Sequence, residues 1–269
     1  MNTFKFGFIG CGNMGGALAA AAAKSLSGGE LAVCDSDASK VAAFCGQTGA
    51  VASTAVGIAA ESAFVCLAVK PQGLSALFAE IGDVLRARKD RFVLVSMAAG
   101  VSMERLRALA EKEDCPVIRI MPNTPVRAGE GMVVYDATEN VAESEINRFL
   151  AGLSAAGRFD RIPERLIDAA GALSGCGPAF VYLFAEALAD GGVECGLPRE
   201  KALLYASQTL AGAAKLLLES GENPAALKDA VCSPGGTTIA GVHALECGAF
   251  RGTVMNAVKA AFEKTSKLS

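Results

Sequence analysis

Short apolar runs alternate with longer helical stretches over residues 1–162 of the chain. The short runs are continuously apolar, which is typical of strands that are buried on both faces of a parallel sheet. The predicted strands are FKFGFIG (4–10), ELAVCD (30–35), SAFVCLAV (62–69), RFVLVSM (91–97), PVIRIM (116–121) and GMVVYD (131–136). Segments such as MGGALAAAAAKSL lie between them and have a helical composition. This order of elements predicts a doubly wound α/β domain.

The pattern changes after Pro163, where convincing strands end and helical runs follow. The predicted helices are GPAFVYLFAEALADGGVECG (177–196), PREKALLYASQTLAGAAKLLLES (198–220) and NPAALKDAVC (223–232). Pro198 and Pro224 are predicted in the first turns of two of these helices. Proline fits there because backbone N–H groups in the first turn have no hydrogen-bond partner within the helix. Residues 163–269 are therefore expected to form a second, all-α domain.

The run ALLYASQTLAGAAKLLL (202–218) is apolar on nearly every face of its predicted helix. Such a helix is either buried in protein or spans a membrane. The run falls short of the roughly 20 apolar residues that cross a bilayer, and Lys215 interrupts it, so burial in protein is favoured. A helical domain of about a hundred residues cannot easily surround such a helix by itself, so we expect a homo-oligomer.

Composition and charge exclude several classes of function. Charged residues make up 20% of the chain, its formal net charge is −3 and no block of like charges occurs, which argues against nucleic-acid binding. The nine cysteines form no C-x-x-C pair and are expected to be buried, reduced thiols. With His243 as the only histidine, no zinc site is expected. The N-terminus lacks a basic leader with a cleavable apolar stretch, so we expect a cytoplasmic protein.

The first chemical motif is GCGNMG, in which Gly10, Gly12 and Gly15 form G-x-G-x-x-G between a predicted strand and a predicted helix. In this context the glycines permit a tight turn, close approach of the backbone to a pyrophosphate, and close packing of the helix. The helix start, with Asn13 and Met14, supplies oriented N–H groups to the phosphates. The alternative is a glycine turn in a fold without a nucleotide. The context favours a Rossmann-type dinucleotide-binding domain.

Asp35 ends the second predicted strand, where an acidic residue usually accepts hydrogen bonds from the adenosine ribose. Its negative charge repels a 2′-phosphate and argues for NADH. Ser36 and Lys40 offer groups that can hold that phosphate, so NADH and NADPH both stay candidates. Spacing alone equally allows Asp35 to be the N-cap of the next helix, with Ser36 or Asp37 sharing the role.

Three further turns, VKP, MAAG and MPNTP, each follow a predicted strand. Ligands of open α/β sheets bind beyond the carboxyl ends of the strands, where small and prolyl residues can shape a slot for nicotinamide. The residues expected to line the cofactor there are Val69, Lys70, Pro71, Ala98 and Asn123. For Lys70 taken alone, a solvated surface amine is the simpler interpretation.

Two further segments, LSGCGPAFVY and SPGGTTIAG, place glycine, proline and small residues directly before a helical run. A helix start of this kind gathers free N–H groups that suit a carboxylate. Thr237 and Thr238 add hydroxyl groups in the second segment. The alternative is that Ser233 or one of these threonines simply caps the helix.

Taken together, these motifs resemble those of the pyrroline-5-carboxylate reductases. The resemblance covers the whole chain and is carried by FIGCGNMG, LAVKP, RIMPNTP, LSGCGPAFVY and SPGGTTIAGVHALE. It implies a Rossmann domain followed by a helical domain that dimerises by interlocking, with dimers commonly assembled into rings. It also implies that NADPH or NADH gives hydride to the cyclic imine 1-pyrroline-5-carboxylate, in the last step of proline synthesis.

The resemblance also implies roles for individual residues. The substrate loop falls on Ser233, Gly235, Gly236, Thr237 and Thr238, whose N–H groups and hydroxyls would hold the substrate carboxylate. Thr238 matches the threonine whose hydroxyl contacts the ring nitrogen, and it is the predicted catalytic residue. Glu164 looks like an acid that the family places near the substrate, although a solvated glutamate explains it equally well. An imine accepts hydride well once its nitrogen is protonated or hydrogen-bonded, so no strong base is required.

Two other functions fit a nucleotide-binding domain. A dehydrogenase of the β-hydroxyacid or 6-phosphogluconate type would need a catalytic lysine on a G-x-x-G-x-G-x-x-x-K-x-x-N-like helix, and the sequence contains no such segment. A non-catalytic dinucleotide sensor would keep the glycine motif but would have no use for SPGGTT.

Overall fold

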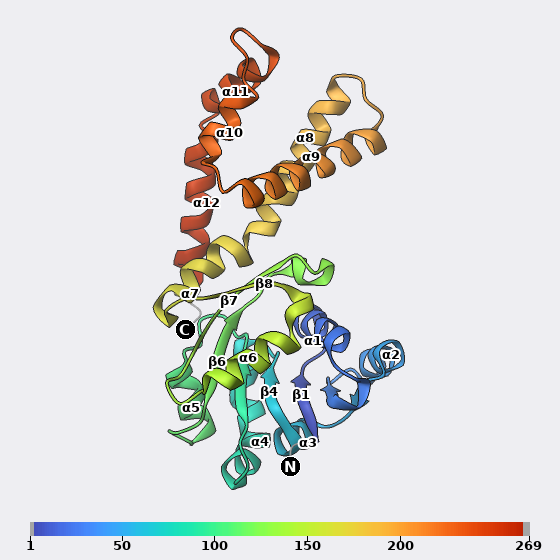
Figure 1. Cartoon of the computed structure of the whole chain (residues 1–269), viewed down its shortest axis with the longest axis vertical. Helices are drawn as coiled ribbons and strands as arrows, with labels where there is room; N and C mark the ends of the chain where they lie inside the picture. Colours follow the sequence, from blue (N-terminus) through green and yellow to red (C-terminus); the bar gives the residue numbers. More distant parts are fainter. Residues whose placement is uncertain (1–2, 266–269) are drawn as a thin grey trace. The chain divides into compact units, whose positions relative to one another are not determined.

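The computed structural model describes residues 3–265 of the chain, shown in Figure 1. Its internal contacts divide it into two compact units. The first unit runs to Cys176 and also takes in the residues from Ala261 onward, and the second unit is Gly177–Ala260. The first unit contains the sheet, and the second is helical.

An eight-stranded sheet forms the centre of the first unit. The strands in chain order are β1 (Phe4–Ile9), β2 (Leu31–Cys34), β3 (Val51–Ala52), β4 (Ser62–Leu67), β5 (Val93–Ser96), β6 (Val117–Met121), β7 (Gly131–Ala137) and β8 (Gly157–Arg161). Their spatial order is β3-β2-β1-β4-β5-β6-β7-β8. The order reverses between β1 and β4, which is where dinucleotides bind in folds of this type. All six predicted strands are present, and β3 and β8 are additional.

The strand β7 departs from the predicted all-parallel sheet. It pairs antiparallel with β6, so that Ile120 lies opposite Tyr135, whereas the other neighbouring strands pair in parallel. Between β6 and β7 the described chain has only a short 3-10 segment, η3 (Thr124–Ala128), and a few flanking residues. A parallel crossover needs a dozen or more residues, so a connection of this length can only reverse the chain.

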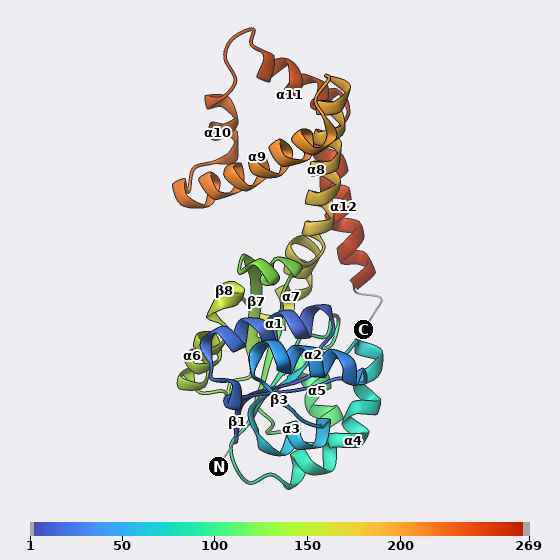
Figure 2. The same cartoon turned by 90° about the vertical axis from the view of Figure 1, so that its right-hand side faces the viewer.

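Helices cover both faces of the sheet. The helices of this unit are α1 (Asn13–Ser25), α2 (Ala38–Thr48), α3 (Ala55–Glu61), α4 (Leu74–Ala87), α5 (Met103–Ala110), α6 (Glu143–Gly152) and α7 (Glu164–Ala170). Buried residues of α1, α2 and α6 form one hydrophobic core with the sheet, and those of α3, α4 and α5 form a second core. Figure 2 shows α1 and α2 side by side. The aromatic rings of Phe6, Phe64 and Phe149 pack together in the first core.

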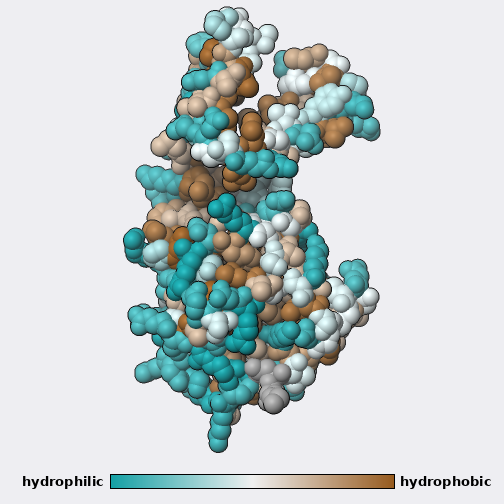
Figure 3. Space-filling view, in the orientation of Figure 1, coloured by the Kyte–Doolittle hydropathy of each residue, from teal (hydrophilic) through white to brown (hydrophobic). Residues whose placement is uncertain are grey.

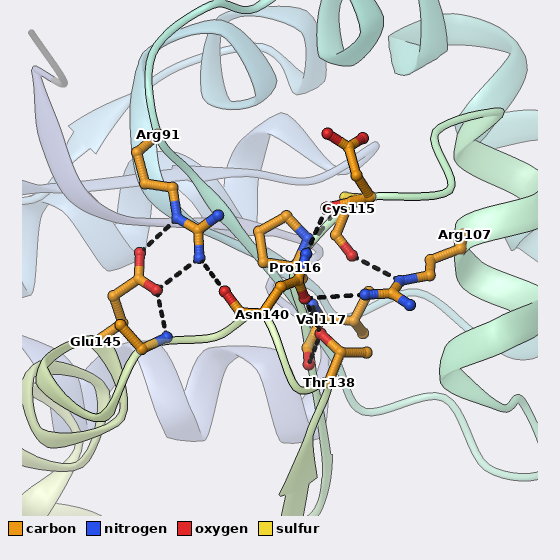
Figure 4. Close-up of polar contacts among 10 residues, drawn as sticks. Arg91, Arg107, Cys115, Pro116, Val117, Thr138, Asn140 and Glu145 are labelled. Atoms are coloured by element: carbon orange, nitrogen blue, oxygen red, sulfur yellow. Dashed lines mark hydrogen bonds and ion pairs between the residues drawn. The ribbon is translucent and has the colours of Figure 1, made fainter.

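A polar network fastens the antiparallel β6–β7 pair to its neighbours, as Figure 4 shows. The guanidinium of Arg91 donates to both carboxylate oxygens of Glu145, at 2.8 and 2.7 Å, and to the carbonyl oxygen of Asn140 at 2.6 Å. The side-chain oxygen of Asn140 accepts from Arg107 at 2.9 Å and from the hydroxyl of Thr138 at 2.7 Å. Glu145 is buried, and its hydrogen bonds to Arg91 are the main cause that holds its pKa below the ordinary value.

The helix α7 belongs to the sheet unit, although the sequence divides the chain at 162/163. Both α7 and the π-helical turn that follows it, η5 (Gly171–Gly175), precede the boundary between the compact units at Cys176 and Gly177. The reason is packing, because α7 lies against β6 and β7. The sheet unit therefore extends to Cys176, beyond the point at residue 162 where convincing strands end in the sequence.

The second unit is built from helices alone. They are α8 (Gly177–Glu194), α9 (Arg199–Ser220), α10 (Pro224–Ala230), α11 (Thr237–Cys247) and α12 (Phe250–Thr265), whose last residues count with the first unit. The predicted helices at 177–196, 198–220 and 223–232 are thus confirmed. The helices α8 and α9 pack on one another through the small side chains of Ala189, Ala202 and Ala206.

Large apolar side chains lie on the surface of the helical unit, where Figure 3 shows brown residues. Leu183 on α8 is 68% exposed, and Leu204 and Leu218 on α9 are 56% and 73% exposed. Within one chain, α9 is therefore not the buried helix that its composition predicts. A surface as apolar as this indicates contact with another protein surface.

All nine cysteines are free thiols. Cys34, Cys66 and Cys115 are buried, and burial raises the pKa of Cys34 and of Cys115 to about 12. The expectation that the thiols are buried is wrong for Cys195 and Cys247, which are exposed on the helical unit.

Candidate functional site

The glycine loop between β1 and α1 has the geometry that a dinucleotide needs. Gly10 has a φ of 108°, and a Cβ on Gly15 would lie 2.2 Å from the carbonyl oxygen of Gly10. These two glycines let α1 start close against the ends of β1 and β4. A Cβ on Gly12 would meet nothing within 4 Å, and Gly12 caps α1 without any side-chain hydrogen bond. The start of α1 is thus open to an anion, which fits the pyrophosphate of a dinucleotide.

Asp35 is joined to the glycine loop. Its Oδ2 accepts a hydrogen bond from the backbone N–H of Cys11 at 2.6 Å, and its Oδ1 accepts from the backbone N–H of Asp37 at 3.0 Å. Partial burial favours the protonated carboxyl, but the N–H donors of Asp37 and Cys11 outweigh it and hold the pKa of Asp35 below its ordinary value. The hydroxyl of Ser36 also points to this carboxylate, at 3.4 Å.

The N-cap of α2 is Asp37, whose carboxylate accepts from the backbone N–H groups of Ser39 and Lys40. The alternative in which Asp35 caps this helix is therefore wrong. Asp35 remains a negative charge at the end of β2, next to the glycine loop. This is the position from which a carboxylate reaches the ribose hydroxyls in nucleotide-binding folds.

The predicted turns after β4 and β5 lie at the carboxyl edge of the sheet. Val69 packs on the core, Lys70 is exposed, and Pro71 begins the short 3-10 segment η2 (Pro71–Gly73). Ala98, which follows β5, is buried, and its N–H donates to the hydroxyl of Ser96 at 3.3 Å. Because the side chain of Lys70 is exposed, the structure agrees with the interpretation of this residue as a solvated surface amine.

Asn123 and Asn13 already have protein partners. The amide nitrogen of Asn123 donates to the carbonyl of Ser174 at 3.0 Å, and its oxygen accepts from the N–H of Met132 at 2.9 Å. Asn123 thereby holds the turn after β6 against η5. The side-chain oxygen of Asn13 accepts from Arg127 at 2.9 Å. Both side chains are therefore held by other parts of the protein.

A cavity of about 280 Å³ opens at the carboxyl ends of β5 and β6. Its lining consists of Met14, Met97, Ala99, Met121, Pro122, Asp168, Gly171, Gly175, Cys176 and Thr265. Met14 comes from the first turn of α1, so the cavity adjoins the glycine loop. Its position relative to the phosphates and its apolar walls suit the nicotinamide end of a dinucleotide. A larger cavity of about 660 Å³ begins at Gly12 and runs between α1 and α2, with Lys40 in its lining.

A buried arginine lies beneath the smaller cavity. Arg119 on β6 has a side chain only 4% exposed, and it forms ion pairs with Asp168 at 2.5 Å and with Glu164 at 3.4 Å. The same oxygen of Glu164 accepts a hydrogen bond from the N–H of Met103 at 2.7 Å. Glu164, a predicted substrate residue, is therefore held by α5 and β6, and the interpretation as a solvated glutamate is wrong.

The segment before α11 also has the predicted shape. Gly235 has a φ of 68°, and the N–H of Gly236 donates to the carbonyl of Ser233 at 3.0 Å, which closes a turn. Gly236 is the N-cap of α11 and makes no side-chain cap bond, while Thr237 and Thr238 are exposed. No serine or threonine side chain caps α11, so the alternative in which Ser233, Thr237 or Thr238 does so is wrong.

Sequence reasoning missed Arg119 and Asp168. The available signals were a single charged residue inside the buried strand PVIRIM, and a second carboxylate four residues after Glu164. Of the methionines in the cavity, Met14 was a predicted cofactor residue, whereas Met97 and Met121 were placed in the turns after their strands but not chosen as site residues. Only the tertiary structure brings these residues to one place.

Comparison with known proteins identifies the family. Residues 164–268 match the family model described as pyrroline-5-carboxylate reductase dimerisation, and residues 5–100 match the one described as NADP oxidoreductase, coenzyme F420-dependent. The pyrroline-5-carboxylate reductase of Pisum sativum is 41% identical over 100% of this chain and 97% of its own length. The chain belongs to the pyrroline-5-carboxylate reductase family. It is thus an NAD(P)H-dependent oxidoreductase of proline biosynthesis, as the sequence motifs predict.

Other relatives agree with this assignment. The pyrroline-5-carboxylate reductase of Escherichia coli K12 is 40% identical over 98% of both chains. The crystal structure of Plasmodium falciparum pyrroline carboxylate reductase, with NADP bound, superposes on this reductase with a TM-score of 0.87, at 32% identity over 100% of this chain and 99% of the other. The predicted fold class, a nucleotide-binding α/β domain followed by a helical dimerisation domain, is confirmed.

Proposed function

We propose that this reductase binds NADH or NADPH along the carboxyl edge of its sheet and holds the carboxylate of 1-pyrroline-5-carboxylate at the start of α11. Two helix starts support the assignment. The glycine-capped start of α1 suits the pyrophosphate, and the glycine-capped start of α11 suits a small carboxylate. Neither start is satisfied by a side-chain cap, so each presents N–H donors to a ligand.

The cofactor-binding residues that we propose are those of the glycine loop, the end of β2 and the strand-end turns. They are Gly10, Gly12, Asn13, Met14, Gly15, Asp35, Ser36, Val69, Lys70, Pro71, Ala98 and Asn123. The bound cofactor supplies hydride to the imine carbon. The chain itself orients the cofactor, excludes water from the cavity at β5 and β6, and supports the nitrogen that becomes an amine.

The substrate-binding residues that we propose are Ser233, Gly235, Gly236, Thr237 and Thr238, with Glu164 as a further acid. The N–H groups of the α11 start bind the carboxylate through charge-assisted hydrogen bonds. Thr238 is the proposed catalytic residue, whose hydroxyl hydrogen-bonds the ring nitrogen and relays a proton to it through water. Addition of one hydride to carbon and one proton to nitrogen converts the imine to the secondary amine of L-proline.

We further propose a homodimer formed by interlocking of the helical units, with dimers assembled into a larger ring. Support comes from the matched dimerisation family and from the exposed apolar side chains of α8 and α9. The helical stretch Glu164–Glu194 is long and apolar enough to cross a bilayer, by length and composition alone. Because this stretch lies in the part matched by the dimerisation family, we assign its apolar residues to subunit contact. The site of action that we propose is the cytoplasm, without membrane or nucleic-acid partners.

The experiment that tests this function follows the oxidation of NADH and of NADPH separately, with 1-pyrroline-5-carboxylate and with its six-membered homologue. We expect oxidation that depends on the five-membered imine. Equal rates with the larger ring would show that the site recognises cyclic imino acids as a class. Oxidation of neither cofactor would contradict the proposed function.

A further inference from the structure

The ion pair between Arg119 and Asp168 is unusual in its setting. Arg119 projects from β6, a strand whose other residues are apolar, and its guanidinium is almost wholly buried. Its Nε is buried as well and has no hydrogen-bond partner among the described residues. Burying a guanidinium is unfavourable for folding unless it is well paired, so an arginine with an unpaired buried Nε in this strand needs an explanation.

The two carboxylates that face Arg119 have different surroundings. Glu164 and Asp168 are one helical turn apart on α7, and both reach Arg119. Glu164 also accepts the N–H of Met103, which makes it part of the contact between α5, α7 and β6. Asp168 instead lines the cavity at the ends of β5 and β6, and its side chain is 33% exposed.

Asp168 is the single charged residue in the lining of that cavity within the described chain. The rest of the lining is apolar or small, with the thioethers of Met14, Met97 and Met121. The hydroxyl of Thr265 donates to the carbonyl of Ala261 at 3.0 Å. Methionine sulfur packs favourably on aromatic rings and adapts to their shape. A flat ring that carries a hydrogen-bond donor at one edge would satisfy both parts of this lining.

We propose that Asp168, held in place by Arg119, orients the nicotinamide by accepting a hydrogen bond from the N–H group of its carboxamide. This inference rests on the proposed function, because it assumes that the cavity receives the nicotinamide. The carboxamide is the part of the ring that presents N–H donors. A fixed acceptor for it sets the rotation of the ring and therefore the face that transfers hydride.

Arg119 is a positioning residue in this arrangement. Its ion pair fixes the direction of the Asp168 carboxylate, since a charged partner at hydrogen-bond distance restricts the rotation of that side chain. Hydrogen bonds to a charged acceptor are stronger than neutral ones. The pair therefore gives a strong and directed acceptor to one donor of the ring.

The test measures binding of reduced cofactors in the absence of any imine. Two ligands are compared by titration calorimetry: the natural reduced dinucleotide, and the reduced 3-acetylpyridine analogue, in which a methyl ketone replaces the carboxamide. The analogue keeps the ring, the ribose and the phosphates but has no N–H donor. We expect the wild-type protein to bind the natural form about 10-fold more tightly or better, the range for a hydrogen bond to a charged acceptor.

Asp168→Ala should bring the two dissociation constants together, because the acceptor is lost. Asp168→Asn keeps a carbonyl acceptor and should retain part of the discrimination. Asp168→Ala leaves the buried charge of Arg119 without this partner and can fail to fold, so Arg119→Met is combined with Asp168→Ala as a second variant. The double variant should lose the discrimination in the same way.

The matched control is Glu145→Gln, which disrupts another buried carboxylate–arginine pair, that of Glu145 and Arg91 (Figure 4). It should keep the full difference between the two ligands. ADP-ribose, which lacks the nicotinamide, should bind all the folded variants equally.

A wild-type protein that binds both reduced ligands equally would overturn the proposal. So would an Asp168→Ala variant, or the double variant, that keeps the wild-type ratio. The proposed function fails separately, by absence of turnover with 1-pyrroline-5-carboxylate, because the binding measurement needs no imine.

Discussion

The carboxylate of Asp35 accepts a hydrogen bond of 2.6 Å from the backbone N–H of Cys11, so the acid at the end of β2 is fixed beside the glycine loop. Because its pKa is held below the ordinary value, it carries a negative charge at neutral pH. This charge stands where the ribose of the cofactor is expected.

The first prediction concerns the choice of cofactor. The reductase should use NADH at least as well as NADPH, because a carboxylate beside a 2′-phosphate is repulsive. Asp35→Ser should shift the ratio of kcat/KM values toward NADPH. Asp37→Ser is the control, since it also removes one negative charge but lies at the cap of α2 and keeps a capping hydroxyl. A hundredfold preference of the wild type for NADPH would show that Asp35 does not face the ribose.

The second prediction concerns assembly. Leu210 and Leu217 lie on α9, and Leu217 is 36% exposed within one chain. Leu210→Glu or Leu217→Glu should disrupt association or folding, because each places a charge in an apolar contact. Lys215→Gln changes an exposed side chain of the same helix and should leave the oligomer intact. Light scattering gives the molar mass, and a stable, active wild-type monomer would refute the prediction.

The third prediction concerns acid stability. The pKa of Glu145 is lowered in the folded protein, mainly by its hydrogen bonds to Arg91. A carboxyl of this kind contributes stability above its unfolded pKa of about 4.3, and this contribution is lost as the pH falls through the folded pKa. Glu145→Gln should therefore lower the free energy of unfolding by about 1–3 kcal/mol at pH 7. The difference from the wild type should shrink below about pH 4.

Urea unfolding at a series of pH values provides the measurement. A difference between Glu145→Gln and the wild type that stays constant from pH 7 to about pH 3 would be incompatible with an ionic contribution from this pair.

The fourth prediction concerns Thr238. If its hydroxyl supports the ring nitrogen more strongly in the transition state than in the bound substrate, Thr238→Ala should lower kcat more than it raises KM. Loss of one donor that serves developing charge costs on the order of 10²-fold in rate. Thr238→Ser keeps the hydroxyl and should retain much of the activity. Circular dichroism and an unchanged affinity for the dinucleotide control for damage elsewhere, and wild-type kinetics of Thr238→Ala would remove the catalytic role.

Much of the fold could be predicted because the buried strands are continuous apolar runs. The strands that were missed carry a weaker signal. β3 has two residues, and β8, with the sequence GRFDR, is half polar and largely exposed at the edge of the sheet. The reversed direction of β7 was predictable in principle, because the short connection after Met121 cannot form a crossover.

The candidate site was predictable to the extent that its residues are close in sequence. The glycine loop and the turn before α11 are local motifs, so their shape follows from glycine and proline. The network of Arg119 with Glu164 and Asp168 joins β6 to α7. Arg119 and Glu164 are 45 residues apart in the sequence. No local pattern encodes such a contact. This separation also explains why the sequence could not decide whether Glu164 is a substrate-binding acid or a solvated surface residue.

The most direct test of the central claim follows the transferred hydride into the product. The protein is incubated with 1-pyrroline-5-carboxylate and a reduced cofactor that carries deuterium in place of both hydrogens at C4 of the nicotinamide, and the amino acid formed is analysed by mass spectrometry and NMR. We expect L-proline with one deuterium at C5, the former imine carbon, and one oxidised cofactor for each proline. Cofactor oxidation without proline, or proline without deuterium at C5, would contradict reduction of this imine by the bound nicotinamide.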